Sequence, residues 1–283
     1  MQIITNKNMN DTIAALTEGQ HLFGEDIIEN SGSKNFFGTT YEYVFEMISE
    51  GTLKNGYEYF NYVADESCKL FLDVDYKTSE NYEMYYATSE DMLGDILTLL
   101  ETFLLTEYEI ELANFTRIVL SSCRADKFSY HIIFPTLIFK DMSHQHDFFE
   151  MFLMQFTGLK NIVDKSVYGK NRCLRLMGCS KKGNEYSLKL FDEASNYDTS
   201  LNPFEIFMLS CIATKTKDST FINVVKKVKH FNEGSVIHLE KSLETNIVDQ
   251  FLDALPSNYY TDYQDWLTIM FCLMEFGNEY LSN

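Results

Sequence analysis

The chain has 283 residues, 45% of them hydrophobic, which is enough to bury one large core or two smaller ones. No apolar run approaches the ~20 residues that a bilayer helix needs, and the first residues show no export signal, so we expect no membrane partner. The formal net charge of -19, if evenly spread, argues against a nucleic-acid partner, because neutralised phosphates supply most of that affinity.

The six cysteines are scattered along the chain, without a Cys-x-x-Cys pair or a histidine at ligand spacing. This pattern argues against both a structural zinc site and a disulfide framework. We therefore expect an intracellular, reducing compartment, without a distinction between cytoplasm and nucleus.

Periodicity predicts mixed helices and strands that do not alternate strictly, which is typical of an α+β fold. The first part of the chain contains a short helix near Asp11 to Thr17, alternating aromatics at Tyr41, Tyr43 and Phe45, and an aromatic cluster at Tyr57, Tyr59 and Phe60. A long amphipathic helix then begins at the N-cap Ser89, followed by strands at 117–121 and 128–134 with a turn at 123–126 and a strand end at Pro135. The remaining elements are a helix from the N-cap Ser143 to Leu153, a strand at 186–191, a helix from Asn202-Pro203 to Ala213, and a strand at 236–239.

The last part of the chain predicts a pair of helices separated by the break Pro256-Ser257-Asn258, with Gly277 ending the second helix. We place one domain at 1–245 and the start of a helical element at 246–283. Such a short pair could hardly bury its own core, so we expect this sequence to be cut from a longer one.

Two carboxylates interrupt the strand-like run from Leu70 to Tyr76. Because strand side chains alternate, Asp73 and Asp75 share one face while Leu72 and Val74 share the other. Two like charges beside a core are costly unless a cation lies between them. The run predicts a site for a divalent metal ion, although an Asp-x-Asp triplet also marks ordinary solvated strand ends.

A second polar face follows at 127–131, where alternation places Lys127, Ser129 and His131 together. An ammonium, a hydroxyl and an imidazole in a row suit a polyphosphate, which offers negative charge and many acceptor oxygens. A structural, hydrogen-bonded histidine is the simpler alternative. The predicted hairpin could turn this face toward the Asp73 strand.

A third cluster lies in the segment 160–189, which holds eight basic and two acidic residues, a local balance of +6. We call it the basic segment. It combines Asp164 with Arg172, Arg175 and Lys181, so a third carboxylate could complete a two-metal centre while the cations hold a triphosphate. Arg172 and Arg175 have opposite parity, so a regular strand would place them on different faces unless a bulge or turn intervenes.

In order, Leu-Asp-Val-Asp at 72–75, Lys-x-Ser-x-His at 127–131 and Val-Asp-x-x-Val-Tyr-x-x-x-Arg-x-x-Arg-Leu at 163–176, with Ser-Lys at 180–181, resemble the three motifs of the archaeo-eukaryotic primase (AEP) superfamily. The likeness is to PrimPol and to primase-helicases of large DNA viruses, and the tail is similar to their C-terminal helical (PriCT-like) element. The resemblance implies an RRM-like antiparallel sheet carrying the acids beside a smaller N-terminal α/β portion.

The resemblance also implies roles for individual residues. Two Mg²⁺ or Mn²⁺ ions would be held by three acids, a nucleoside triphosphate by six donors, and His131 would be catalytic as well, with Tyr168 as packing. The acids are Asp73, Asp75 and Asp164, and the donors are Lys127, Ser129, His131, Arg172, Arg175 and Lys181.

The expected function is template-directed nucleotidyl transfer on single-stranded DNA, with NTP or dNTP as substrate and a helicase module or other replication proteins as partners. Two alternatives stay open. Asp-x-Asp also marks manganese-dependent glycosyltransferases, which would not need the Lys127 face or the arginine cluster. A replication-assembly module without activity would use the acids only to bridge to the basic segment.

Overall fold

Two sheets and five α-helices form the part of the chain described by the computed structural model, which covers residues 3–6, 8–29, 31–62, 67–80, 84–214, 216 and 218–224. These residues fall within one unit, Met1–Lys227. The α+β prediction is confirmed. The predicted strand at 236–239 and the predicted helical element at 246–283 lie outside the described residues.

The first sheet joins strands that are far apart in the sequence. Its spatial order is β1-β3-β2-β4-β8, with every neighbouring pair antiparallel. The outer strand β8 comes from the basic segment and pairs with β4 more than 100 residues earlier. The strands are β1 (Ile4–Asn6), β2 (His21–Asp26), β3 (Lys34–Thr39), β4 (Gly56–Phe60) and β8 (Arg172–Arg175).

The second sheet is built around β7, which pairs with β5 along one edge and with β6 and the short parallel β10 along the other. β9 extends the sheet beyond β6. The hairpin predicted from 117–121 and 128–134 is thus confirmed as β6 and β7. The strands are β5 (Cys68–Lys77), β6 (Ile118–Ser121), β7 (Lys127–Phe139), β9 (Lys189–Leu190) and β10 (Thr220–Phe221).

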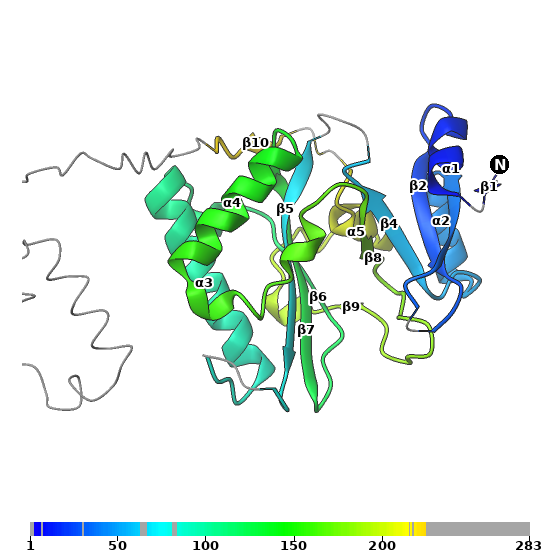
Figure 1. Ribbon diagram of the computed structural model, residues 1–283. Helices are drawn as coiled ribbons and strands as arrows, with labels where there is room; N and C mark the ends of the chain where they lie inside the picture. The colour runs from blue at the N-terminus through cyan, green and yellow to red at the C-terminus, as the bar shows by residue number, and fades with distance from the viewer. Residues whose placement is uncertain are drawn as a thin grey trace, which may run out of the picture. The chain divides into compact units, whose positions relative to one another are not determined.

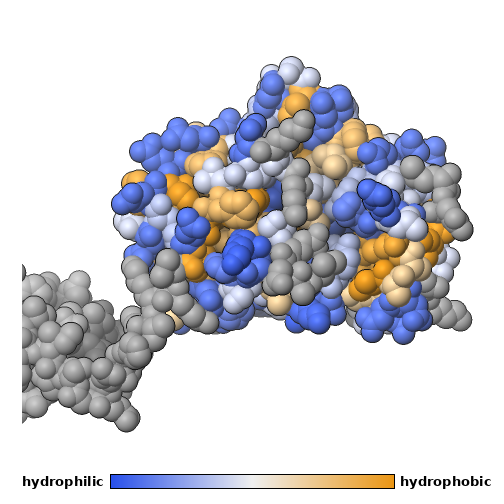
Figure 2. All heavy atoms as spheres, turned by 90° about the horizontal axis from the view of Figure 1, so that it is seen from above, coloured by the Kyte–Doolittle hydropathy of each residue, from blue (hydrophilic) through white to orange (hydrophobic). Residues whose placement is uncertain are grey.

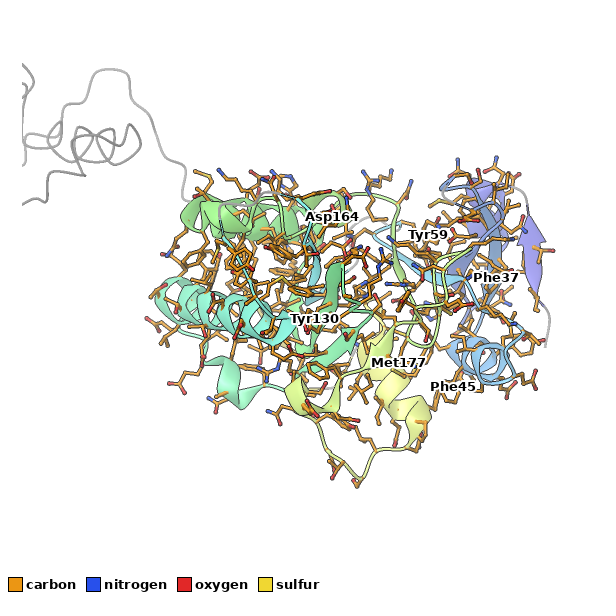
Figure 3. The ribbon with its side chains drawn as sticks, turned by 90° about the horizontal axis from the view of Figure 1, so that it is seen from below. Phe37, Phe45, Tyr59, Tyr130, Asp164 and Met177 are labelled. Carbon is orange, nitrogen blue, oxygen red and sulfur yellow. The ribbon has the colours of Figure 1, made fainter. Side chains whose placement is uncertain are left out.

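Each sheet has its own hydrophobic core. Figure 1 shows α3 (Ser89–Tyr108) and α4 (Met142–Gln155) together on one side of β5 and β7, where their buried phenylalanines pack. α2 (Tyr41–Ser49) and α5 (Pro203–Ser210) cover the first sheet with a smaller core, and α1 (Met9–Ala15) lies near β1 and β3. The half-buried Met177 packs against both cores, and Figure 3 shows it between Phe45 and Tyr130.

Four 3₁₀ turns complete the described chain: η1 (Leu112–Asn114), η2 (Thr157–Leu159), η3 (Lys165–Val167) and η4 (Asp192–Ala194). The N-cap of η3 is Asp164. That position lies beside β5 and is described with the site below.

Two helices begin at other N-cap residues than the sequence predicted. The N-cap of α3 is Thr88 rather than Ser89, and the N-cap of α4 is Asp141 rather than Ser143, because these side chains accept hydrogen bonds from the first-turn amides. The prediction at Asn202 is confirmed, although α5 ends at Ser210 and not at Ala213.

Three further predictions need correction. The alternating aromatics Tyr41, Tyr43 and Phe45 lie on helix α2, whose N-cap Thr40 accepts from the amide of Tyr43. Pro135 does not end a strand, because β7 passes through it to Phe139 with a bulge opposite Lys69 and Leu70 that absorbs the missing N–H donor. The strand predicted at 186–191 shrinks to β9.

The capping box of α5 gives a stability prediction. The Asn202 side chain accepts from the amide of Glu205, and the Glu205 carboxylate accepts from the amide of Asn202. Replacing Asn202 with alanine should therefore cost about 1 kcal/mol of unfolding free energy, measured by urea denaturation. Replacement with glycine should cost only a few tenths of a kcal/mol. Equal losses for both variants would contradict a capping role.

Polar residues cover most of the face seen in Figure 2, with separate hydrophobic patches between them. In the described part of the chain, no helix has the length and apolar character needed to cross a bilayer.

Candidate functional site

The acids of β5 lie where alternation predicts. Leu72 and Val74 are fully buried in the core, whereas Asp73 and Asp75 open toward the other face, with 18% and 38% of their side chains exposed. Phe71 shares their face but is itself buried beneath Tyr168 and Phe60. The strand therefore holds two carboxylates on a rigid, well-packed support.

The polar face of β7 stands directly beside these acids. In the antiparallel register Asp73 is opposite His131, and Asp75 is opposite Ser129. The Lys127 ammonium lies 2.7 Å from Asp75 Oδ2, and His131 Nε2 lies 3.5 Å from Asp73 Oδ1. Two of the three predicted clusters thus meet across one strand pair.

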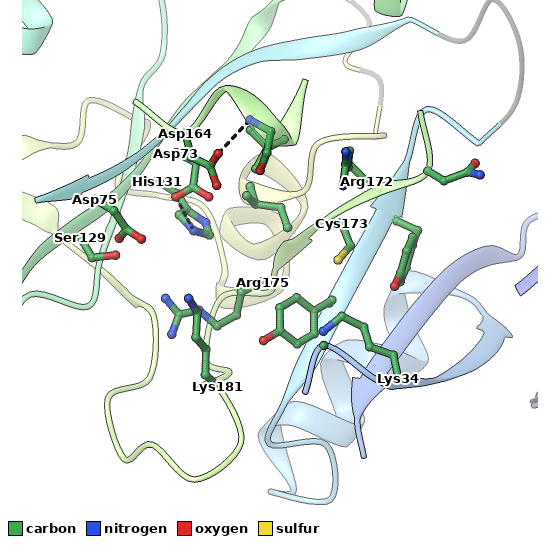
Figure 4. Close-up of a pocket in the computed structure, with 17 residues that line it drawn as sticks. Lys34, Asp73, Asp75, Ser129, His131, Asp164, Arg172, Cys173, Arg175 and Lys181 are labelled. Carbon is green, nitrogen blue, oxygen red and sulfur yellow. Dashed lines mark hydrogen bonds and ion pairs between the residues drawn. The ribbon is translucent and has the colours of Figure 1, made fainter. Parts of the chain in front are cut away.

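The third acid reaches the same place by a short extended segment that runs along β5. The amide of Asp75 donates to the Ile162 carbonyl, and the amide of Asp164 donates to the Asp73 carbonyl, both at 2.9 Å. Asp164 then caps η3, its Oδ1 accepting from the Ser166 amide at 2.8 Å, as the dashed line in Figure 4 marks. The structure therefore gathers all three predicted acids on one wall.

Burial and like charge together shape the electrostatics of this wall. Burial, followed by the charges of Asp75 and Asp164, raises the pKa of Asp73 from 3.8 to about 7, against the opposing influence of Lys181 and Arg175. A cation placed among the three carboxylates would reverse this repulsion.

His131 experiences the opposite field. Burial and the nearby positive charges of Arg175, Lys181 and Lys127 lower its pKa well below 6.5, so its ring is neutral at physiological pH. Its Nδ1 is buried without a hydrogen-bond partner among the described residues. A neutral imidazole offers one donor and one acceptor to a ligand.

Two of the predicted cations, Arg172 and Arg175, come from β8 of the first sheet, and Lys181 lies in the loop that follows β8. Arg175 on β8 donates from Nη2 to Ser122 Oγ at 3.0 Å and from Nη1 to the Tyr186 carbonyl at 3.3 Å, which fixes its guanidinium beside the β6–β7 turn. In Figure 4, Arg175 and Lys181 lie together below His131, whereas Arg172 lies apart from them. β8 is a regular strand without a bulge, so Arg172 and Arg175 lie on different faces of it, and Cys173 shares the face of Arg175.

Acids and cations face each other across a pocket of about 350 Å³. One wall is the β5–β7 pair and the other is β4 and β8, so the pocket lies between the two sheets. Every predicted site residue lines it except Lys127, which is held on Asp75. Tyr168, predicted as packing, is buried and stacks on Phe149 with ring centroids 3.7 Å apart.

Several pocket residues were not anticipated. Lys34 and Tyr57 lie on the wall opposite the acids, where the Lys34 ammonium sits 3.4 Å from the centre of the Tyr57 ring. Tyr57 and Tyr59 had been predicted only as parts of an aromatic cluster. Their alternation was the available signal, because it places both rings on one face of β4. The unanticipated residues are Gly32, Lys34, Tyr57, Tyr59, Ser166, Val167, Asn171, Cys173 and Leu174.

The donor chemistry of the acidic wall fits a hard divalent cation. Asp73, Asp75 and Asp164 offer only carboxylate oxygens, the ligands that Mg²⁺ and Mn²⁺ prefer. Over the described ranges, no three acidic, histidine or cysteine side chains converge closely enough to ligate one ion. One oxygen of the Asp75 carboxylate, Oδ2, is engaged by the Lys127 ammonium.

Comparison with known families agrees with this geometry. A family model described as the N-terminal AEP domain of the C962R protein matches residues 8–190, nearly two thirds of the chain. That range contains β2 to β8 and all predicted site residues. The comparison with curated proteins gives no match. The chain belongs to the C962R-type archaeo-eukaryotic primase family, whose domain is a primase-type nucleotidyltransferase.

Proposed function

We propose that this chain is a template-directed nucleotidyltransferase, a primase or primase-polymerase that synthesises or extends primers on single-stranded DNA. The observation that carries the proposal is the pocket between the sheets, where three carboxylates on one wall face Arg175 and Lys181 on the other. Carboxylates for two metal ions opposite cations for a triphosphate are the parts that phosphoryl transfer requires.

Each residue has a proposed task in this reaction. Asp73, Asp75 and Asp164 would hold two Mg²⁺ or Mn²⁺ ions, which supply Lewis acidity to the attacking 3′-hydroxyl and to the leaving pyrophosphate. Arg175 and Lys181 bind phosphate oxygens by charge-assisted hydrogen bonds.

The remaining predicted donors act around this centre. Ser129 and the neutral His131 donate to the triphosphate from beside the acids. Lys127 joins them when it leaves Asp75, and Arg172 contributes from the outer end of β8. Single-stranded template would lie along the basic segment, and the chain would work within a larger replicative primase-helicase.

The two alternatives receive less support. Membership of a primase-type family does not favour a nucleotide-sugar enzyme. A module without activity would use its acids to bridge to the basic segment, but among the described ion pairs none joins Asp73 to that segment, and none involves Asp164, which lies within it. Asp75 pairs instead with Lys127.

A primer-extension assay tests the proposal. The chain is incubated with a single-stranded DNA template, an annealed primer, labelled NTP or dNTP, and Mg²⁺ or Mn²⁺. We expect the primer to lengthen by the nucleotides that the template specifies, and the product to disappear with EDTA or without template. Absence of product with both metals and both nucleotide types would refute the proposal. Transfer from a nucleotide-sugar would favour the glycosyltransferase instead.

A further inference from the structure

Among the pocket cations, the Lys181 ammonium, like the Arg172 guanidinium, has no ion pair or hydrogen bond with a described residue. It nevertheless lines the pocket with the acids, and its charge reaches both Asp73 and His131. A lysine side chain loses up to about 2 kcal/mol of rotamer entropy when it is fixed. The position of this charge therefore depends on how its backbone is held.

One anchor of that backbone is Asn55, in the turn before β4. Its Nδ2 donates to the Ser180 carbonyl at 3.1 Å and to Ser180 Oγ at 3.2 Å. The amide of Ser180 donates in turn to the Lys54 carbonyl at 2.9 Å. The residue immediately before Lys181 is thus held through its amide, its carbonyl and its hydroxyl by the turn before β4.

The second anchor is Asp26, at the end of β2. Its Oδ2 accepts from the amide of Lys182 at 3.4 Å, and its carbonyl accepts from Lys182 Nζ at 3.4 Å. The carboxylate is itself fixed by the Tyr57 hydroxyl at 2.8 Å and by the Lys34 ammonium. Although burial opposes ionisation, these hydrogen bonds lower the pKa of Asp26, so the anchor stays charged.

The two anchors are also joined to each other. The amide of Asp26 donates to the Asn55 carbonyl at 3.2 Å. Residues on each side of Lys181 are therefore held by one connected unit of the first sheet, 125 and 156 positions away in the sequence.

We propose that Asn55 and Asp26 are positioning residues that aim Lys181 at the nucleoside triphosphate. The inference rests on the proposed function and adds to it a task for the N-terminal sheet. Neither side chain lines the pocket between the two sheets. They act through the backbone of the loop, so their loss should weaken triphosphate binding only as far as Lys181 contributes to it.

A double-mutant cycle on the full chain tests this. Affinities for a nucleoside triphosphate and for single-stranded DNA are measured for wild type, Asn55→Ala, Lys181→Ala and the double variant, with melting temperatures for each. We expect Asn55→Ala to weaken triphosphate binding by about fivefold to tenfold, with DNA binding unchanged. In the Lys181→Ala background the same substitution should add no further loss.

Two other variants complete the design. Asn114→Ala is the matched control: it removes an exposed side-chain amide from η1, between α3 and β6, and should leave both affinities at wild-type values. Should Asn55→Ala fold poorly, Asp26→Asn replaces it: it keeps an oxygen acceptor for Lys182 but loses the charge that binds Lys34. A two- to fivefold loss that vanishes without Lys181 is then expected.

The outcomes separate the two proposals. If wild type binds triphosphate and Asn55→Ala binds it equally well, the positioning role is refuted. A loss that persists without Lys181 also refutes it, because the anchor would then act elsewhere. If wild type binds no triphosphate and Lys181→Ala changes nothing, the proposed function fails together with the inference.

Discussion

Replacing Asp73 with asparagine should abolish nucleotidyl transfer and, at neutral pH, stabilise the metal-free protein. An Asp-to-Asn change keeps the shape but removes the charge that holds a metal ion. Loss of a residue that merely orients a metal ligand costs about 10–100-fold, so losing a ligand should cost more than about 100-fold in primer extension. Glu193→Gln, an exposed acid on η4, is the matched control and should retain full activity.

The stability part follows from proton linkage. The pKa of Asp73 rises to about 7 in the folded state from 3.8 in the unfolded state, so between these values the folded state binds the extra proton. The contribution of Asp73 to stability is therefore greatest below pH 3.8, falls as the pH rises from 3.8 to about 7, and levels off above that. Asparagine does not titrate, so the difference in free energy of unfolding between Asp73→Asn and wild type should grow as the pH rises from 3.8 to about 7.

Urea denaturation in EDTA at several pH values between 4 and 8 measures this difference. Added Mg²⁺ or Mn²⁺ should raise the melting temperature of wild type and leave that of Asp73→Asn unchanged, a readout independent of activity. Parallel pH profiles for the two proteins would contradict the assigned environment of Asp73.

Replacing Glu58 with alanine should lower the free energy of unfolding by about 3–5 kcal/mol, more than the capping variants of α5. The fully buried Glu58 carboxylate on β4 accepts hydrogen bonds from the Tyr41 hydroxyl and from the amides of Ile212 and Ala213. Removing it would leave three buried donors without partners and remove the charge that faces the buried ammonium of Lys69.

From its position on β5, Lys69 forms hydrogen bonds with the same segment, at the end of α5 and just after it. Its ammonium donates to the carbonyls of Met208, Leu209 and Cys211 and to Thr214 Oγ1. Urea denaturation of Glu58→Ala, Lys69→Met and the double variant measures the coupling. Because both side chains hold one segment, the double loss should be smaller than the sum of the single losses. Strict additivity, or a loss below 1 kcal/mol for Glu58→Ala, would contradict this account.

Local pattern sufficed to predict the acidic wall of the pocket but neither the opposite wall nor the pocket itself. Alternation placed Asp73 and Asp75 on one face of β5, and the hairpin placed His131 on the matching face of β7. Those inferences depend on neighbours two residues apart. By contrast, the pairing of β8 with β4 joins strands separated by more than 100 residues, and nothing in the local sequence of either strand specifies its partner.

The burial of Glu58 and Lys69 was not predicted, for a related reason. Glu58 stands between Tyr57 and Tyr59, and Lys69 precedes the apolar run of β5, so both read as ordinary solvent-facing positions. They are buried because the segment after α5 lies over them and supplies backbone partners. The aromatic alternation at Tyr41 likewise suggested an extended strand, but the Thr40 cap begins a helix there.

The return of β8 to the first sheet limits how this fold can be divided. The segment around Asp164 is hydrogen-bonded to β5, yet eight residues later the chain has crossed to β4. An N-terminal fragment ending near residue 62 would therefore lack the outer strand of its own sheet, and a fragment beginning there would carry that strand unpaired. The two sheets are interlocked rather than modular, so exchanging the first sixty residues between relatives requires exchanging residues 172–175 with them.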